Sequence, residues 1–425
     1  MTRLSFSRLL IPDRCYILCM NFVFISPHFP VRYFKWAQSL KARGVTVLGI
    51  GDTPFQNLHP KLVAALTEYY QVWDMNNYDQ MVAACQYFEN KYGKIDFIES
   101  QNEWWLELDA RLRERFNVDT GFHPEDMRHI KAKSAMKEFF QRAGAKTMRY
   151  LVVKGPQDKD AALAFIKKVG YPVFVKPDIG VGASESYSLK TPEDVDRFFS
   201  KDLPEPYIME EFIDGRIVSF DGICDSKGDV VFCTTDHFPV PIAQVVNEGL
   251  DHMYVTVPFA KPMIDVDPVA FEKTGRAVVK SFGIKRRFFH IEFFVLNSDK
   301  KGFAKKNDFV ALECNMRAPG GYTPDLIDFA NSVSVYDIFA DVICYDENRQ
   351  NMDLPKYYAV ASHRKNSLSY AHTLDEVYAR YHGKIKAAGV YPAHIAAVMG
   401  DNYVFACFDT IEEAYEFDEF TRAKR

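Results

Sequence analysis

The stretch that decides the fold is Phe309-Val-Ala-Leu-Glu-Cys-Asn-Met-Arg317, together with the earlier run Arg287-Phe-Phe-His-Ile-Glu-Phe-Phe-Val295. Both runs are largely apolar and carry polar residues at alternate positions, a pattern that predicts two neighbouring strands. Successive side chains of a strand point to opposite faces of its sheet, so Glu313, Asn315 and Arg317 are expected on one face.

The neighbouring strand presents His290 and Glu292 in the same alternating phase. Two carboxylates and an amide on adjacent strands are hard oxygen donors, which Mg²⁺ prefers when it shares its shell with substrate phosphates. Two unpaired carboxylates among Phe and Val would be costly to bury, so a cation there is physically reasonable. The alternative is a solvated face of the sheet. We interpret Glu292, Glu313 and Asn315 as metal ligands.

A second segment, Phe174-Val-Lys-Pro-Asp-Ile-Gly-Val-Gly-Ala-Ser184, predicts a strand that delivers Lys176 and is followed by a flexible loop. Gly180 and Gly182 allow successive backbone N–H groups to turn towards one point, as in loops that cradle phosphate oxygens, while a lysine supplies a point charge. An ordinary turn between two strands is the competing interpretation.

A third segment, Tyr207-Ile-Met-Glu-Glu-Phe-Ile-Asp-Gly215, is extended and can present backbone groups to the edge of a flat heterocycle. The carboxylate of Glu210 could accept a hydrogen bond from an exocyclic amine. Paired glutamates on a strand are more commonly one exposed and one hydrogen-bonded residue, so this segment alone decides nothing.

From Asn21 onward, apolar runs alternate with helical patterns, which predicts a parallel sheet covered by helices on both faces. Gly44 is expected to end the first helix. No GxGxxG follows the first strand, so the dinucleotide-binding fingerprint is missing. A long helix is expected over residues 128–143, and capping boxes at Thr191, Thr373 and Thr410 predict three further helix starts.

The composition is that of a globular protein, with 48% hydrophobic and 26% charged residues and a formal net charge of −5. The interleaved charges exclude a basic stripe for nucleic acid, and no apolar run reaches the length of a membrane span. The eight scattered cysteines show neither disulfide nor zinc spacing and are expected to be reduced, as in a cytoplasmic protein. Residues 1–19 are expected to be an extension, with Met20 as the natural start.

In this order the segments resemble the ATP-grasp superfamily over about residues 130–340. The resemblance places Lys133, with Lys131 as the alternative, and Lys176 on the phosphates of ATP and places Glu210 at its adenine. Further residues that it implies for ATP are Gly180, Gly182, Ala183, Ser184, Glu211, Phe212 and Ile213. It implies Mg²⁺, with Mn²⁺ as an alternative, on Glu292, Glu313 and Asn315, and catalytic roles for Arg317, His290 and Lys176.

The resemblance implies a mixed α/β and α+β fold of the ATP-grasp type. After the extension (1–20), we expect a Rossmann-like parallel-sheet domain (21–125), a helix with a small lid subdomain (126–206), a larger antiparallel-sheet subdomain (207–345) and a small C-terminal α+β module (346–425). One departure stands out. Many relatives carry a ribose-binding glutamate two residues after the hinge glycine, where this chain has Ile217, so ribose contacts would fall to Asp214 or Asp221.

The implied activity is that of an ADP-forming carboxylate–amine ligase, which activates a carboxylate as an acyl phosphate with Mg-ATP and passes it to an amine or similar nucleophile. A phosphotransferase with the same ATP site and a nucleotide-binding module without turnover are the two competing functions. The expected partners are ATP, a small carboxylate and an amine, without nucleic acid or membrane, and a homodimer is left open. Residues 236–254 are expected to contribute to specificity.

Overall fold

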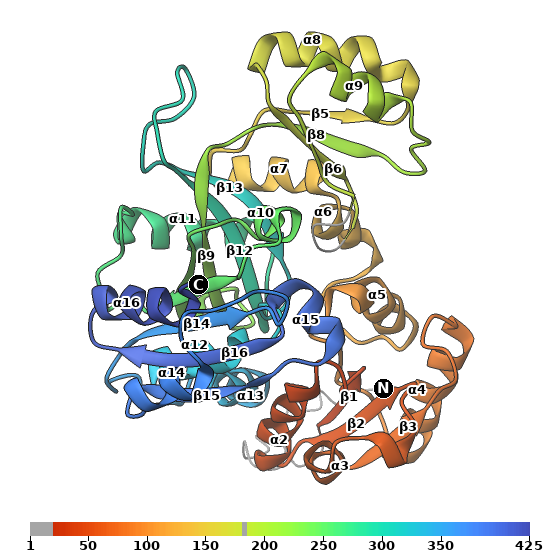
Figure 1. Cartoon of the computed structure of the whole chain (residues 1–425). Coiled ribbons are helices and arrows are strands. Elements are labelled where there is room, and N and C mark those ends of the chain that lie inside the picture. The colour runs from red at the N-terminus through yellow and green to blue at the C-terminus, as the bar shows by residue number, and fades with distance from the viewer. Residues whose placement is uncertain (1–19, 181–184) are drawn as a thin grey trace. The chain divides into compact units, whose positions relative to one another are not determined.

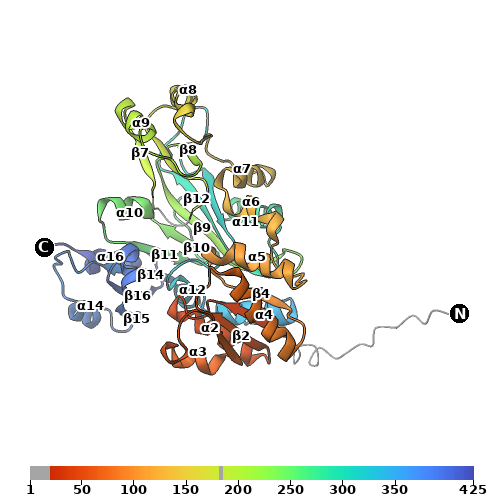
Figure 2. The same cartoon turned by 90° about the vertical axis from the view of Figure 1, so that its right-hand side faces the viewer.

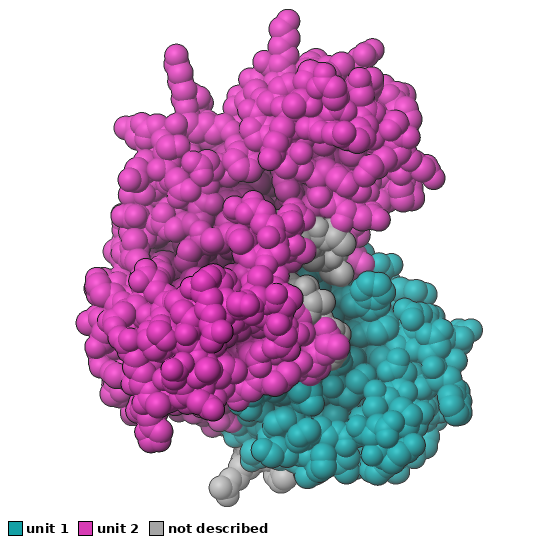
Figure 3. Space-filling view, in the orientation of Figure 1, with its two compact units in different colours: residues 1–124, 339–347 teal, residues 125–338, 348–425 magenta. Residues whose placement is uncertain are grey.

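The computed structural model describes residues 20–180 and 185–425. The expectations for residues 1–19 and for Gly182, Ala183 and Ser184 therefore lie outside the described residues. The chain divides into two compact units, residues 1–124 with 339–347 (unit 1) and residues 125–338 with 348–425 (unit 2), coloured separately in Figure 3. No helix in the described part of the chain is both long and apolar enough to cross a membrane.

Unit 1 is built around a four-stranded parallel sheet with the order β3-β2-β1-β4. Its strands are β1 (Asn21–Ile25), β2 (Thr46–Gly51), β3 (Glu68–Gln71) and β4 (Phe97–Glu99), and its helices are α2 (Phe34–Ala42), α3 (Pro60–Ala65), α4 (Tyr78–Tyr92) and α5 (Leu106–Arg115) (Figure 1). The first strand begins at Asn21 as predicted, and Gly44 follows the end of α2 with a φ of 86°. The predicted parallel-sheet α/β architecture is confirmed.

The small sheet of unit 2 is antiparallel, with the order β5-β8-β6-β7. Its strands are β5 (Tyr150–Val153), β6 (Val173–Pro177), β7 (Tyr187–Leu189) and β8 (Tyr207–Glu211). Helices α8 (Lys159–Val169) and α9 (Pro192–Phe199) pack on this sheet through one apolar cluster, and Figures 1 and 2 show both helices beside it. The predicted capping box of Thr191 with Asp194 opens α9.

The large sheet of unit 2 has eight antiparallel strands in the order β13-β12-β9-β10-β11-β14-β16-β15. The first five along the chain are β9 (Gly215–Cys224), β10 (Val230–Phe238), β11 (Met253–Val257), β12 (Arg287–Leu296) and β13 (Phe309–Asn315). Helix α11 (Pro268–Ser281) covers one face, where its Phe271 ring lies edge-on to those of Phe220 and Phe293. Helix α10 (Ile242–Glu248) lies within the segment expected to govern specificity.

The C-terminal strands β14 (Tyr358–Arg364), β15 (Ile385–Val390) and β16 (Asn402–Phe408) extend this same large sheet. They do not form a separate sheet, because β14 pairs directly with β11. The remaining helices are α12 (Thr323–Asn331), α13 (Val335–Tyr345), α14 (Leu374–Arg380), α15 (Ala393–Met399) and α16 (Ile411–Arg422). Thr373 and Thr410 open α14 and α16 with the predicted capping boxes.

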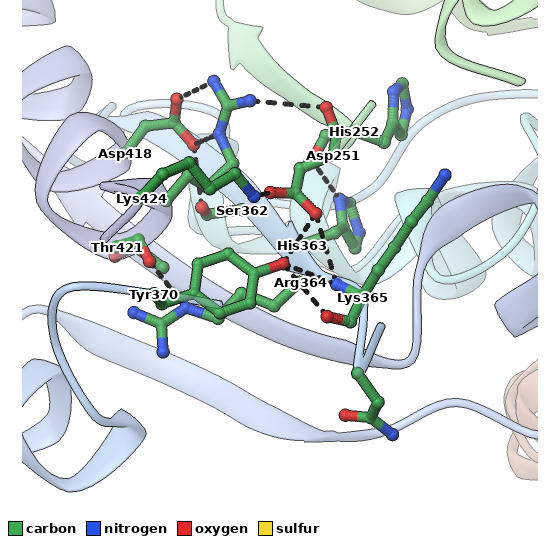
Figure 4. A network of polar contacts seen from close by, with 12 residues as sticks. Asp251, His252, Ser362, His363, Arg364, Lys365, Tyr370, Asp418, Thr421 and Lys424 are labelled. Carbon is green, nitrogen blue, oxygen red and sulfur yellow. Dashed lines mark hydrogen bonds and ion pairs between the residues drawn. The ribbon is translucent and has the colours of Figure 1, made fainter. Parts of the chain in front are cut away.

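Partly buried polar contacts fasten the end of the chain to the segment that follows α10 (Figure 4). Asp251 accepts hydrogen bonds from the Tyr370 hydroxyl (2.7 Å) and the Lys365 amide (3.2 Å), and it forms an ion pair with Lys424. Arg422 donates to the carbonyl of Asp251 at 3.3 Å. The tail of the chain therefore holds one end of the segment expected to govern specificity.

The prediction of a single helix over residues 128–143 is wrong in its continuity. The structure has two helices, α6 (Met127–Lys131) and α7 (Lys133–Arg142), separated by Ala132 in an extended conformation. The break frees the first N–H groups of α7, and Asp178 satisfies them: its carbonyl accepts from the Lys133 amide (2.9 Å) and its carboxylate from the Ser134 amide (2.7 Å). A helix start that is capped from a distant loop leaves no local sequence signal.

Candidate functional site

Two lysines meet one buried glutamate beneath the small sheet. Lys176 on β6 and Glu210 on β8 project from neighbouring antiparallel strands, and Lys176 Nζ lies 3.1 Å from Glu210 Oε2. On α7, Lys137 Nζ lies 2.5 Å from Glu210 Oε1. Burial raises the pKa of Glu210, but the charges of Lys137 and Lys176 outweigh it and hold that pKa at about 2. Glu210 is therefore ionised and sits between two cations.

The carboxylates of the large sheet also attract Lys176 electrostatically. Burial lowers its pKa, but Glu210, Glu313 and Glu292 together outweigh that effect and raise it. Lys176 thus faces the same region as Glu292 and Glu313. The lysine of the small sheet and the carboxylates of the large sheet therefore converge on one region.

Lys133 joins the same region from the start of α7. Its Nζ donates to the Gly180 carbonyl at 3.0 Å and lies 3.5 Å from Glu313 Oε1. The side chain is nearly buried, with 6% of its surface exposed. Since Asp178 also caps α7, the helix start holds the beginning of the glycine loop at two points.

The two predicted metal-binding acids are direct cross-strand partners. β12 and β13 pair Glu292 with Glu313 and His290 with Asn315, so the four side chains share one face as predicted. The carboxylates are 22% and 20% exposed, which leaves each open to a ligand. His290 Nε2 lies 3.1 Å from Glu292 Oε1.

Arg317 lies beyond β13, which ends at Asn315. The predicted strand was two residues too long, because the carbonyl of Met316 accepts a hydrogen bond from Arg287 Nε (2.9 Å) in place of a strand partner. The guanidinium of Arg317 still reaches the acidic region, since its charge helps to lower the pKa of Glu292. For Glu292 burial acts in the opposite direction, and the hydrogen bond from His290 is the largest of the lowering causes.

The donor set fits a hard divalent cation that is completed by substrate oxygens. No group of three or more His, Cys, Asp or Glu side chains suited to a metal occurs among the described residues. A cation would therefore rest on Glu292, Glu313 and the amide oxygen of Asn315. Mg²⁺ is commonly held by one or two carboxylates together with substrate phosphates. The two carboxylates and one amide oxygen of this site match that type of coordination.

A buried polar chain lies behind His290. His290 Nδ1 is 2.5 Å from Asp221 Oδ1, Ser219 bridges from Asp221 to the Asp236 amide (3.1 Å), and Thr256 donates to Asp236. Burial lowers the pKa of His290, but Asp221 and Glu292 outweigh it and raise the pKa to about 10. Burial and the neighbouring Asp221 raise the pKa of Asp236 well above its ordinary value.

The predicted adenine strand divides its two glutamates between opposite faces. The Glu211 carboxylate accepts from the Arg149 amide (2.9 Å) and guanidinium (2.6 Å), and Lys300 Nζ lies 3.3 Å away. Phe212 is 41% exposed, whereas Ile213 is buried. Glu211 therefore has a structural role in tying β8 to neighbouring segments.

Of the two acids considered for ribose, the structure favours Asp214. Ile217 packs in an apolar cluster with Ile213 and Leu312. Asp221 is fully buried and engaged by His290. Asp214 is exposed, and its carboxylate accepts only the amide of Asn297 (2.9 Å) among the side-chain contacts described.

Two residues of the site were not foreseen from the sequence. Lys137 is one turn after Lys133 on α7. This i, i+4 spacing, which places both lysines on one face of the helix, was the only sequence feature that could have indicated Lys137 as a site residue. Asp236 sits on β10 opposite Ser219, and only the pairing of strands distant in sequence brings it to Asp221. Both residues were missed because their partners come from other segments.

Several solved structures share this fold along nearly the whole chain. An L-amino acid ligase from Bacillus licheniformis matches with a TM-score of 0.69 at 15% identity, covering 94% of this chain and 96% of that one. An N5-carboxyaminoimidazole synthetase from Staphylococcus aureus matches with a TM-score of 0.67 at 15% identity, with the same coverage. The biotin carboxylase domain of the 2-oxoglutarate carboxylase from Hydrogenobacter thermophilus, solved with MgADP, ADP and bicarbonate, has a TM-score of 0.65 at 16% identity and covers 93% of this chain and 88% of that one.

Sequence similarity is more limited. A phosphoribosylamine–glycine ligase of Xanthomonas axonopodis pv. citri is 32% identical over 115 residues, which span 25% of this chain and only 26% of that enzyme. No family model matches the chain. The structural matches show that the chain has the ATP-grasp fold, so the resemblance noted in the sequence is confirmed at the level of the fold.

Proposed function

We propose that the protein is an ATP-dependent ligase that activates a carboxylate as an acyl phosphate and transfers the acyl group to an amine or similar nucleophile. The observation that carries this proposal is the meeting of Lys133 and Lys176 with the facing carboxylates Glu292 and Glu313. Cations and a carboxylate-bound metal around one point are what phosphoryl transfer needs, because its catalysis depends on positioning and charge stabilisation.

The similar enzymes support the choice of ATP and Mg²⁺. The Staphylococcus synthetase was also solved in complex with ADP, and the Hydrogenobacter domain with MgADP. In this chain Glu292, Glu313 and Asn315 would hold the cation, and the cation would offset the negative charge of the transferred phosphoryl group. Glu210 is already bound by two lysines, so adenine recognition is assigned to the backbone of residues 211–213.

The reaction has two steps, formation of the acyl phosphate and its attack by the amine, and different residues of the chain serve each step. A carboxylate oxygen of the substrate attacks the γ-phosphorus of ATP, ADP leaves, and an acyl phosphate forms; the amine then attacks its carbonyl carbon and phosphate leaves. Lys133 and Lys176 hold the phosphates. Arg317 and the protonated His290 lie beside Glu292, where they can bind the anionic acyl phosphate. The Asp221 carboxylate fixes the imidazole ring of His290 from behind.

The proposal is tested by a screen of paired carboxylates and amines for release of phosphate and ADP. The expected result is release that requires both substrates and yields an amide-type product. Replacing Glu313 by Ala is expected to abolish it, whereas Asp229→Asn, at an exposed acid in the β9–β10 turn, is expected to leave it unchanged. A stable phosphorylated product would instead assign a phosphotransferase, and nucleotide binding without turnover across the screen would contradict both enzymatic functions.

A further inference from the structure

Lys137 is the most deeply buried cation of the site. Its side chain is 1% exposed, compared with 6% for Lys133 and 11% for Lys176. Its closest acidic partner is Glu210, at 2.5 Å, and Glu210 is itself only 3% exposed at its side chain. Lys137 is therefore enclosed beside Glu210 and is less accessible than either Lys133 or Lys176.

Glu210 holds two cations with one charge. Burial lowers the pKa of both lysines. For Lys176 the carboxylates of Glu210, Glu313 and Glu292 outweigh burial and raise the pKa, whereas for Lys137 burial outweighs the attraction of Glu210 and Glu313 and the pKa is lowered. A phosphate group that binds Lys176 must draw it away from Glu210. A buried carboxylate left without a partner is strongly destabilised, so Lys176 can leave only if another cation stays.

We propose that Lys137 is a positioning residue: it remains on Glu210 as a permanent counter-cation and so releases Lys176 to bind the phosphates of the nucleotide. The two lysines of α7 then have different tasks. Lys133 lies beside Gly180 and Glu313, towards the phosphates, and Lys137, one turn later, holds Glu210 in place. This inference rests on the proposed nucleotide site.

The inference predicts that a second substitution partly restores the affinity for MgADP that a first one lowers. The affinity is measured by titration calorimetry. In Lys137→Met, Lys176 becomes the only partner of Glu210 among the described residues, so the affinity is expected to fall about tenfold or more. Adding Glu210→Gln removes the charge that retains Lys176, so the double variant is expected to bind more tightly than Lys137→Met. Lys137→Arg keeps a cation there and is expected to stay within about threefold of the wild type.

A second comparison keeps the test decisive if Lys137→Met does not fold. In a Glu210→Gln background, adding Lys137→Met is expected to change the affinity by less than about threefold, because there is no carboxylate left to neutralise. A loss of about tenfold in that background would mean that Lys137 binds the nucleotide directly, and it would overturn the inference. Lys167→Met, at an exposed lysine of α8, is the matched control.

Failure of the inference can be told apart from failure of the proposed function. If the wild-type protein binds MgADP but the double variant is no tighter than Lys137→Met, the counter-cation role is wrong while the nucleotide site stands. If the wild-type protein binds no MgADP, the proposed function falls, and the inference falls with it.

Discussion

The buried carboxylate of Glu210 makes a quantitative prediction about acid stability. Its pKa is about 2 in the folded chain against an ordinary 4.5, because Lys137 and Lys176 outweigh the effect of burial. A carboxyl with a lowered pKa stabilises the fold above pH 4.5, and that contribution disappears as the pH falls through 2. The shift corresponds to about 3 kcal/mol at pH 7, of which less than half is lost by pH 3.5.

The perturbation is Glu210→Gln, measured by urea unfolding at pH 7 and pH 3.5 with circular dichroism. The free energy of unfolding of the wild type is expected to fall by about 1 kcal/mol more than that of the variant across this range. Glu138→Gln, at the exposed Glu138–Arg142 pair of the same helix, should follow the wild type. Parallel pH dependences for the wild type and Glu210→Gln would refute the assigned charge of Glu210.

Three further expectations concern the large sheet. Gly275→Ala should destabilise the protein by about 1–3 kcal/mol in urea unfolding, because a Cβ there would lie 2.4 Å from the ring of Phe220; an unchanged midpoint would contradict this packing. Burial lowers the pKa of His363 to about 4, so stability should fall as the pH drops from 6.5 to 4, and His363→Gln should flatten that slope in the same assay. Asp251→Asn should increase hydrogen exchange in the last turn of α16, since the Lys424 ion pair is lost (Figure 4), and unchanged exchange would argue against this fastening.

Local patterns predicted much of the fold. The alternation in residues 287–295 and 309–317 predicted that Glu292 and Glu313 lie on one face of neighbouring strands, and the capping boxes at Thr191, Thr373 and Thr410 marked three helix starts. These features depend on residues close together in the chain, which is why a single sequence reveals them.

Features that depend on distant partners were not predicted. The break at Ala132 follows from capping of α7 by Asp178, a residue 46 positions away, and nothing in residues 128–143 signals it. Lys137 resembles any other charged residue of an amphipathic helix until Glu210 is placed beside it. A small C-terminal α+β module was predicted, but the addition of its strands to the large sheet requires the pairing of β14 with β11.

The central claim is that this site forms an acyl phosphate, and an oxygen-labelling experiment tests it most directly. A carboxylate that supports turnover is supplied with ¹⁸O in its carboxyl group, together with ATP and the amine, and the released phosphate is examined by mass spectrometry. Attack of the carboxylate on the γ-phosphorus places one carboxyl oxygen in that phosphate, so one ¹⁸O per phosphate released is expected. Unlabelled phosphate, with all ¹⁸O left in the carboxyl-derived product, would contradict the account.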